Sequence, residues 1–239
     1  MLTLSKIPRL PSMALAALLS LPISTAWAGV VGAWQLDSES QGIRLYTREV
    51  QGEPLKEFRG VMQVHAPLAQ VAAMLADVPA LPEWFFLMRE ARYLQVEHAQ
   101  DSYIYLAMKG LWPVSPRDSV AHVSVTQDPI TLTINVLIKS ADGILPKQDG
   151  FVRIPSMHSS WRLTPVTNTH TEVEIVGHAD PGGWIPVSIA NFAVTTLPRE
   201  SLKKMRVRIA QTDYRDVGRL YAKNPKLQEL AQRLRFPGL

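Results

Sequence analysis

Two short segments decide the expected fold: residues 112–118 (WPVSPRD) and residues 180–186 (DPGGWIP). Prolines keep the first segment extended and out of strand pairing, directly before an apolar strand pattern. In the second segment, Pro181 and Gly182 fit the central positions of a type II turn, and Pro186 fits the first turn of a helix. The two segments therefore predict a hollow domain in which a sheet and a long helix close around an apolar interior.

The rest of the chain predicts many strands and few helices. Alternating apolar residues predict strands at 42–48 and 57–65, and apolar residues at helical spacing predict a helix over 66–77. Strand patterns separated by turn residues then predict an antiparallel meander over 90–97, 102–109, 119–127, 131–139, 150–153 merging into 160–165, and 171–178. A long helix is expected over 186–211, either kinked or split at Pro198.

This order of elements predicts an α+β fold, in which a curved antiparallel sheet wraps around the long C-terminal helix. That arrangement buries the apolar faces of both. Hydrophobic residues make up 46% and charged residues 19% of the 239 residues, which is typical of a chain with a sizeable core. Because the chain contains no cysteine, the core must be stable without disulfides. We expect one domain over 29–211, followed by a helical tail over 212–239.

Residues 1–28 have the pattern of a secretory signal peptide. Lys6 and Arg9 precede an apolar stretch at 13–23, and the sequence AWA that ends at Ala28 has the small-x-small pattern of a signal peptidase site. A membrane anchor is the alternative, but the apolar stretch is shorter than the about 20 residues that span a bilayer. We expect cleavage after Ala28 and export of a soluble protein, with the periplasm as its compartment.

The sequence contains no motif that indicates catalysis or a bound metal. The HExxH, GxSxG and Walker motifs are absent, and the six histidines are scattered over different predicted elements without metal-ligand spacing. The formal net charge of +4 includes basic residues of the expected leader, so the chain has no bias toward nucleic acid. We therefore expect a protein that is not an enzyme and has no cofactor, no metal and no nucleic-acid partner.

Arg117 and Asp118 are candidates for a polar site within the apolar interior. If both are extended, they face opposite ways, so one of them points into the concave face of the sheet. A charge there requires a partner, because burying an unpaired charge costs much free energy. An ion pair with a distant residue and contact with a ligand are both open. The strand pattern at 103–108 (YIYLAM) is apolar on both faces, which indicates a cavity lining or a face covered by helices.

Short motifs occur in order along residues 34–210: GIRLYTR at 42–48, FRG at 58–60, PEW at 82–84, WPxxxRD at 112–118, GFVR at 150–153, SWRLTP at 160–165 and DPGGWIP at 180–186. In this order they resemble the START-domain family, the steroidogenic acute regulatory protein-related lipid-transfer proteins, although an export signal is unusual there. The resemblance implies a helix-grip fold with an internal tunnel that binds one lipid non-covalently. It also implies that Arg117 and Asp118 lie near the lipid head and that the loop before the last helix opens for entry.

The aromatic pattern and the resemblance together predict ligand contacts from Trp84, Tyr103, Tyr105, Trp112, Arg117, Asp118, Trp161, Trp184, Ile185, Ile189 and Phe192. The expected function is binding and transfer of a sterol-like lipid or a phospholipid, with transient membrane contact. A helix-grip enzyme is the first alternative, with Arg117, His122 and Asp118 as acid and base. The second alternative is a protein-binding module, which an open apolar trough would favour.

Overall fold

The computed structural model describes residues 32–53, 55–211, 216, 218, 221–222 and 225–237. The expected signal peptide at 1–28 lies outside the described residues, and so does part of the expected tail. Among the helices of the described part of the chain, none is both long and apolar enough to cross a membrane.

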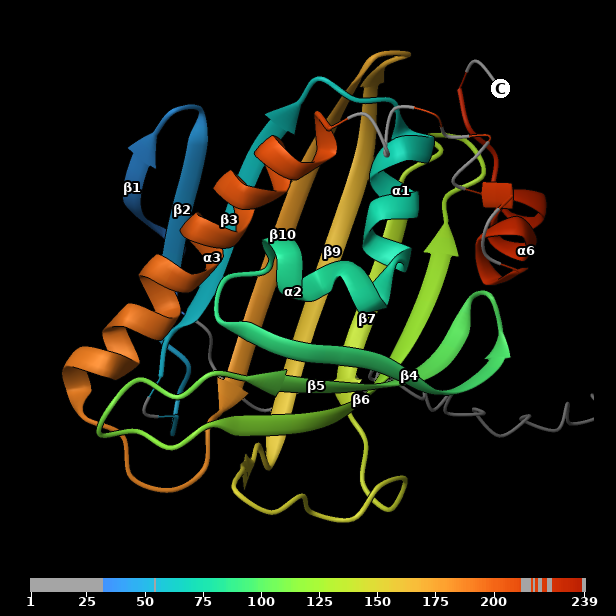
Figure 1. The fold of residues 1–239 in the computed structure, drawn as a ribbon. Helices are drawn as coiled ribbons and strands as arrows, with labels where there is room; N and C mark the ends of the chain where they lie inside the picture. Colours follow the sequence, from blue (N-terminus) through green and yellow to red (C-terminus); the bar gives the residue numbers. More distant parts are fainter. Residues whose placement is uncertain are drawn as a thin grey trace, which may run out of the picture.

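The molecule is built on a ten-stranded sheet in the order β1-β2-β3-β10-β9-β7-β6-β5-β4, with the short strand β8 paired in parallel with the start of β6 (Figure 1). The other strand pairs are antiparallel. The strands are β1 (Gln35–Ser40), β2 (Ile43–Arg48), β3 (Glu57–Val64), β4 (Met88–His98), β5 (Asp101–Met108), β6 (Arg117–Gln127), β7 (Ile134–Ser140), β8 (Val152–Arg153), β9 (Ser156–Thr167) and β10 (His170–Asp180).

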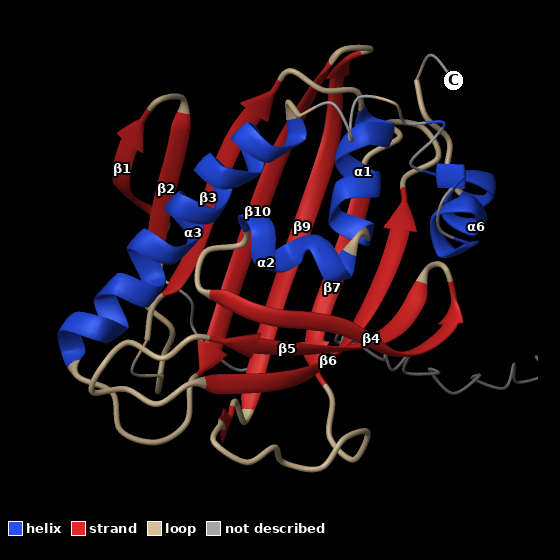
Figure 2. Cartoon of the chain, viewed as in Figure 1, coloured by secondary structure: helices blue, strands red, loops and turns tan. Residues whose placement is uncertain are grey.

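Three helices lie on the same side of this sheet, as Figure 2 shows: α1 (Leu68–Ala76), α2 (Leu81–Trp84) and α3 (Val187–Ile209). A single 3-10 turn, η1 (Val78–Ala80), links the first two. A further helix, α6 (Pro225–Arg233), follows in the tail. The expected α+β helix-grip fold, an antiparallel sheet with a long helix packed against it, is confirmed.

The sheet is strongly curved, so that β4, β5 and β6 run across the direction of β3, β10 and β9 (Figure 2). Strands twist by default, and a bulge adds a local bend. β4 shifts its register against β5 between Met88 and Glu90 and again between Tyr93 and Gln95. These irregularities favour the bend that turns a flat sheet into a concave one.

α3 crosses the concave side over β2 and β3 (Figure 1). Gly60 of β3 permits this close approach, since a Cβ atom there would lie 2.7 Å from Cδ1 of Leu202. Leu202 and Met205 are fully buried between helix and sheet. α3 runs through Pro198 as one helix, so the expected split does not occur.

Two strands differ from the sequence-based expectation. β1 was not expected, because most of its residues are exposed and show no apolar alternation. Residues 150–153 were expected to merge into the next strand, but Val152 and Arg153 form β8 by pairing with Arg117 and Asp118. This pairing places Arg153 beside Asp118, which matters for the charges described below.

The tail packs against the domain through α6. Tyr221 and Leu227 form a small buried cluster with Ala69 and Ala73 of α1. The hydroxyl of Tyr221 donates a hydrogen bond of 3.0 Å to the carbonyl oxygen of Ala69. α6 thus covers the end of the molecule where α1 lies, opposite the N-terminal end of α3 (Figure 1).

Candidate functional site

An apolar cavity of about 270 Å³ lies between the concave face of the sheet and α3. Its walls come from β5, β6, β9 and β10, from the segments that follow α2, and from the N-terminal half of α3. Most lining residues are aliphatic or sulfur-containing, including Leu106, Met108, Met157, Ile175, Ile189 and Leu197. The cavity therefore lies between secondary structure on opposing sides and is partly open.

Strand alternation determines which residues of β5 and β6 reach the cavity. Ile104 and Leu106 of β5 line it, and so do Arg117 and Ser119 of β6. The alternate residues of both strands point to the outer face. There, Tyr105, Ala107 and Val120 form a cluster with Leu145 and Phe151. The apolar outer face of β5 is thus covered by the segment that leads into β8, and not by a helix.

Arg117 is the ionic side chain of β6 that lines the cavity, and it is only 9% exposed. Its Nη1 donates to the carbonyl oxygen of Ser115 at 2.6 Å, and its Nη2 donates to that of Gly182 at 3.3 Å. Its Nε is buried and has no hydrogen-bond partner. Burial lowers the pKa of Arg117 from its ordinary value, since the surroundings disfavour the charged form.

Asp118 points to the outer face and is paired there. Its side chain is fully buried and bonds to Arg153, from Nε and from Nη2, at 2.9 Å each. Burial, followed by the charge of Asp118, raises the pKa of the neighbouring Tyr105 to about 12. Of the two open interpretations, the ion pair with a distant residue therefore holds for Asp118, and ligand contact remains a prediction for Arg117.

The structure brings together four of the residues expected to contact a ligand: Arg117, Ile185, Ile189 and Phe192 all line the cavity. Ile185 lies in the loop between β10 and α3, and the other two apolar residues lie one helical turn apart on α3. These apolar residues at the start of α3 thus face the cavity.

The other expected residues lie elsewhere. Trp84 and Trp161 are buried in the main core, where their rings pack edge to face with their centroids 6.1 Å apart. Tyr103 and Tyr105 point to the outer side of β5, for the alternation given above. Trp112 and Trp184 project into solvent and are 94% and 74% exposed.

The cavity also has lining residues that were not among the expected ligand contacts, including Phe58, Phe85, Leu87 and Met157. Leu87 has a backbone φ of 63°, which is rare and strained for a large side chain. Its carbonyl oxygen accepts a 2.8 Å hydrogen bond from the backbone of Lys109. Every second residue of a strand faces the cavity, so alternation limits the strand residues to two sets. The sequence alone does not say which of the two sets faces the cavity.

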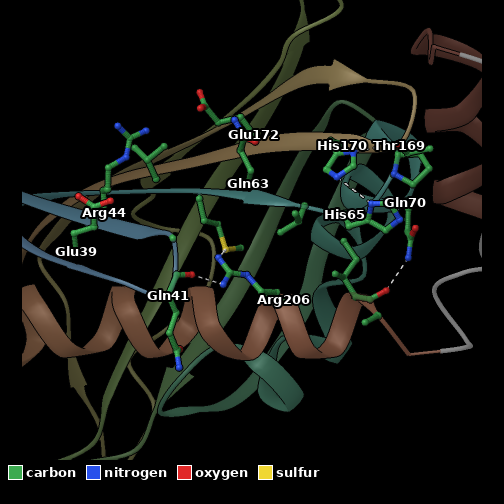
Figure 3. Close-up of a pocket in the computed structure, with 17 residues that line it drawn as sticks. Glu39, Gln41, Arg44, Gln63, His65, Gln70, Thr169, His170, Glu172 and Arg206 are labelled. Carbon is green, nitrogen blue, oxygen red and sulfur yellow. Dashed lines mark hydrogen bonds between the residues drawn. The ribbon is translucent and has the colours of Figure 1, made fainter.

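A second hollow, a polar groove of about 1070 Å³, lies near the C-terminal end of α3 (Figure 3). Arg206 bridges it by donating to the carbonyl oxygen of Gln41 at 2.6 Å, and His65 and His170 share a hydrogen bond of 3.0 Å. Charged residues such as Glu172 also line this groove. None of the expected ligand contacts lies in it, so the apolar cavity is the candidate site.

The residues of the enzyme alternative do not meet in the cavity. Arg117 lines it, whereas His122 and Asp118 lie on the opposite face of β6. His122 bonds to Asp101 at 2.7 Å, outside the cavity. Within the described part of the chain, no group of three or more histidine or acidic residues is arranged to hold a metal.

Comparison with known proteins matches residues 27–212 to the family described as START domain. A crystal structure of a STAR-related lipid transfer protein from Xanthomonas axonopodis is 34% identical, covers 74% of this chain and 99% of its own, and superposes with a TM-score of 0.69. An uncharacterized protein of Pseudomonas aeruginosa is 32% identical over 72% of this chain and 85% of its own length. Human STARD10, at 16% identity, has a TM-score of 0.72 over 84% of this chain and 82% of its own, and shares the fold.

Proposed function

This chain belongs to the START-domain family, and we propose that it binds a single lipid molecule in the apolar cavity and transfers it between membranes. The observation that carries the proposal is the cavity itself, which lies between the sheet and α3 and is lined mostly by apolar side chains. The name of the Xanthomonas axonopodis relative, a lipid transfer protein, supports the same function.

The energetics of such a cavity suit a lipid. Burial of apolar surface contributes roughly 25 cal/mol per Å², so acyl chains or sterol rings supply the affinity. A few polar groups then fix the orientation of the molecule. Arg117 is the polar group best placed for this role, since it lines the cavity next to Ser115 and Gly182.

One end of the cavity lies between two loops. Leu111 and Val114 of the β5–β6 loop line it, as do Pro181 and Ile185 of the β10–α3 loop. These loops lie side by side at the start of α3 (Figure 1), and Arg117 bonds across to Gly182. We name this end of the cavity the mouth and propose that the lipid enters here when the β10–α3 loop opens.

The exposed tryptophans favour the same end for contact with membranes. Trp112 lies in the β5–β6 loop and Trp184 in the β10–α3 loop, so both stand beside the mouth. Tryptophan is enriched where a protein meets the interface of a bilayer, because its ring is apolar and its N–H is polar. The proposal is that these two side chains dock the mouth on a membrane during transfer.

We also propose that the protein works after export, on the basis of the leader pattern that ends at Ala28. An aqueous compartment between two membranes is a barrier for poorly soluble lipids, and a carrier overcomes that barrier. N-terminal sequencing of the protein recovered from the cell envelope is the test, with Gly29 expected as the first residue. Recovery with residues 1–28 intact would refute export with cleavage.

The proposed function is tested by purifying the mature protein under native conditions, extracting it with organic solvent and identifying what co-purifies. We expect a lipid in the extract, and exchange of that lipid for fluorescent phospholipid or sterol analogues. A protein that is empty and also fails to take up any of these analogues would contradict lipid binding.

A further inference from the structure

The feature that leads further is the state of Arg117, a buried cation without an acidic partner. Its two hydrogen bonds go to neutral backbone carbonyls, and its Nε has no partner. A buried charge is costly unless an opposite charge meets it. Resting on the proposed function, we propose that the cargo is an anionic amphiphile, whose carboxylate or phosphate pairs with Arg117 at the mouth.

The acidic residues near Arg117 already have partners and point elsewhere. Asp118 faces the other side of β6, where Arg153 binds both of its carboxylate oxygens. Asp180 accepts a 2.9 Å hydrogen bond from the backbone N–H of Gly182, within its own loop. The chain thus supplies no carboxylate to Arg117 among the described residues, and the counter-charge must come with the ligand.

The described lining residues of the cavity include no acidic side chain. The ionic ones are Lys56, Lys109 and Arg117, and the histidines are His158 and His178. Lys56 and His158 have acidic partners, Glu49 and Glu57, which do not line the cavity. A neutral lipid would leave Arg117 uncompensated, whereas an anionic one adds the missing charge.

One edge of the guanidinium has no strong acceptor, and an edge of this kind is suited to a two-oxygen anion. Nε and Nη2 lie on one edge, and two oxygens of a carboxylate or phosphate can accept from such an edge in parallel. Nε is free, and the Nη2 contact with Gly182, at 3.3 Å, is long for a hydrogen bond from a charged donor. Nη1 can stay on Ser115, at 2.6 Å, and hold the edge in place.

The same geometry connects cargo to the mouth. An anion on this edge binds beside the carbonyl oxygen of Gly182, the acceptor through which Nη2 ties the β10–α3 loop to β6. Gly182 has a φ of 66°, a left-handed conformation that glycine adopts without strain. The proposed anion site therefore lies next to the loop through which the cargo is proposed to pass.

The inference is tested with two matched pairs of lipids, each bound to the mature protein below its solubility limit or critical micelle concentration and followed by calorimetry. The first pair is oleate and methyl oleate, and the second is oleoyl lysophosphatidic acid and mono-oleoylglycerol. We expect the wild type to prefer at least one anionic member by about tenfold or more, as for a charge-assisted hydrogen bond in a buried site. The pair that shows the preference distinguishes a carboxylate from a phosphate head.

Variants assign the preference to one side chain. Arg117→Met is expected to abolish the preference and to keep the affinity for the neutral member. Arg162→Met is the matched control, because Arg162 lies on the outer face of β9 with a side chain that is 58% exposed, and it should keep the preference. Arg117→Lys retains the positive charge but lacks the paired N–H donors of the guanidinium, so it should keep only part of the preference.

The outcomes separate the two proposals. Equal affinity of the wild type for the anionic and neutral members of both pairs would overturn the anionic cargo and leave lipid binding intact. Binding of none of the four would overturn the proposed function itself. A preference that survives in Arg117→Met would assign it to another residue and overturn the inference. If circular dichroism shows that this variant does not fold, Arg117→Gln replaces it: loss of the preference supports the inference, and survival of the preference overturns it.

Discussion

Arg153 holds Asp118 through two hydrogen bonds of 2.9 Å, one to each carboxylate oxygen, on the outer face of β6. Arg153 also donates to the carbonyl oxygens of Leu145 and Pro146, so it fastens the segment before β8 to the sheet. Because Asp118 pairs with Arg153 on this face, it is not available to neutralise its neighbour Arg117 in the cavity. The ion pair therefore fastens the segment before β8 and also leaves the charge of Arg117 without an acidic partner.

Asp118→Ala should destabilise the fold strongly while leaving the cavity lining in place. Removing one partner of a buried pair leaves the other charge uncompensated, which costs about 3–5 kcal/mol. Urea denaturation measures the change in the free energy of unfolding. Asp149→Ala, at an exposed position in the same segment, is the control and should have little effect. A loss below about 1 kcal/mol for Asp118→Ala would contradict the assigned role of the pair.

Gly60→Val should lift α3 from the sheet. A Cβ at this position would lie 2.7 Å from Leu202 and 3.2 Å from Cγ2 of Ile175, so a branched side chain does not fit. Overpacking of this kind costs about 1–3 kcal/mol, which a lowered Tm by circular dichroism would report. Gly32→Val is the control, since the nearest atoms to its Cβ are 3.7 Å away. An equal Tm for both variants would mean that α3 is not seated as described.

Replacing Trp112 and Trp184 together by alanine should slow transfer between vesicles several-fold, because the mouth loses its interfacial anchors. Equilibrium affinity for cargo should change little, since neither residue lines the cavity. Transfer is followed by fluorescence exchange between donor and acceptor vesicles. Ile130→Ala is the control: this residue is 90% exposed but lies beyond the far end of β6 from the mouth. An unchanged transfer rate in the double variant would remove these tryptophans from the account.

Lys226 of α6 predicts a pH dependence of stability. Its Nζ donates to the hydroxyl of Ser102 at 2.9 Å and lies 3.9 Å from the centre of the Tyr93 ring. Burial lowers the pKa of Lys226 from 10.5 to about 8. Between these two values the unfolded chain binds more protons than the folded one, so the free energy of unfolding rises with pH over that window.

The measurement is denaturant unfolding at about pH 7 and about pH 9.5, below the range where buried tyrosines contribute. The wild type should gain stability at the higher pH relative to Lys226→Met, which lacks the titrating group. Lys147→Met, at an exposed position, should behave like the wild type. The same pH response in the wild type and Lys226→Met would show that α6 does not bury this lysine.

The sequence was sufficient to predict most strands in their order along the chain, and the long helix. Apolar alternation and helical spacing are strong signals where an element has one buried face. It failed for β1, whose residues are largely exposed, and for β8, whose two residues are set by pairing with β6. Both strands depend on a neighbour in space, and a local pattern carries no information about that neighbour.

The sequence indicated the segments that contribute to the candidate site better than it indicated which residues of those segments line the cavity. Ile189 and Phe192 lie at the cavity because helical spacing defines a face, and Ile185 lies there in the loop just before α3. The choice between Arg117 and Asp118 depends on the absolute parity of β6, which alternation alone leaves undetermined. The four tryptophans singled out show the same limit. Their side chains are identical, yet Trp84 and Trp161 fill the core, whereas Trp112 and Trp184 are exposed.

The most direct test of the central claim is native mass spectrometry of the mature wild type and of Ala193→Trp, both purified without detergent. Ala193 lines the cavity, so an indole at this position occupies the space proposed for the lipid. Asn191→Trp places the same indole at an exposed position on α3 and serves as the control. We predict one lipid mass per chain in the wild type and in Asn191→Trp, and none in Ala193→Trp. The same lipid occupancy in Ala193→Trp as in the wild type would contradict the account, because the lipid would then bind elsewhere.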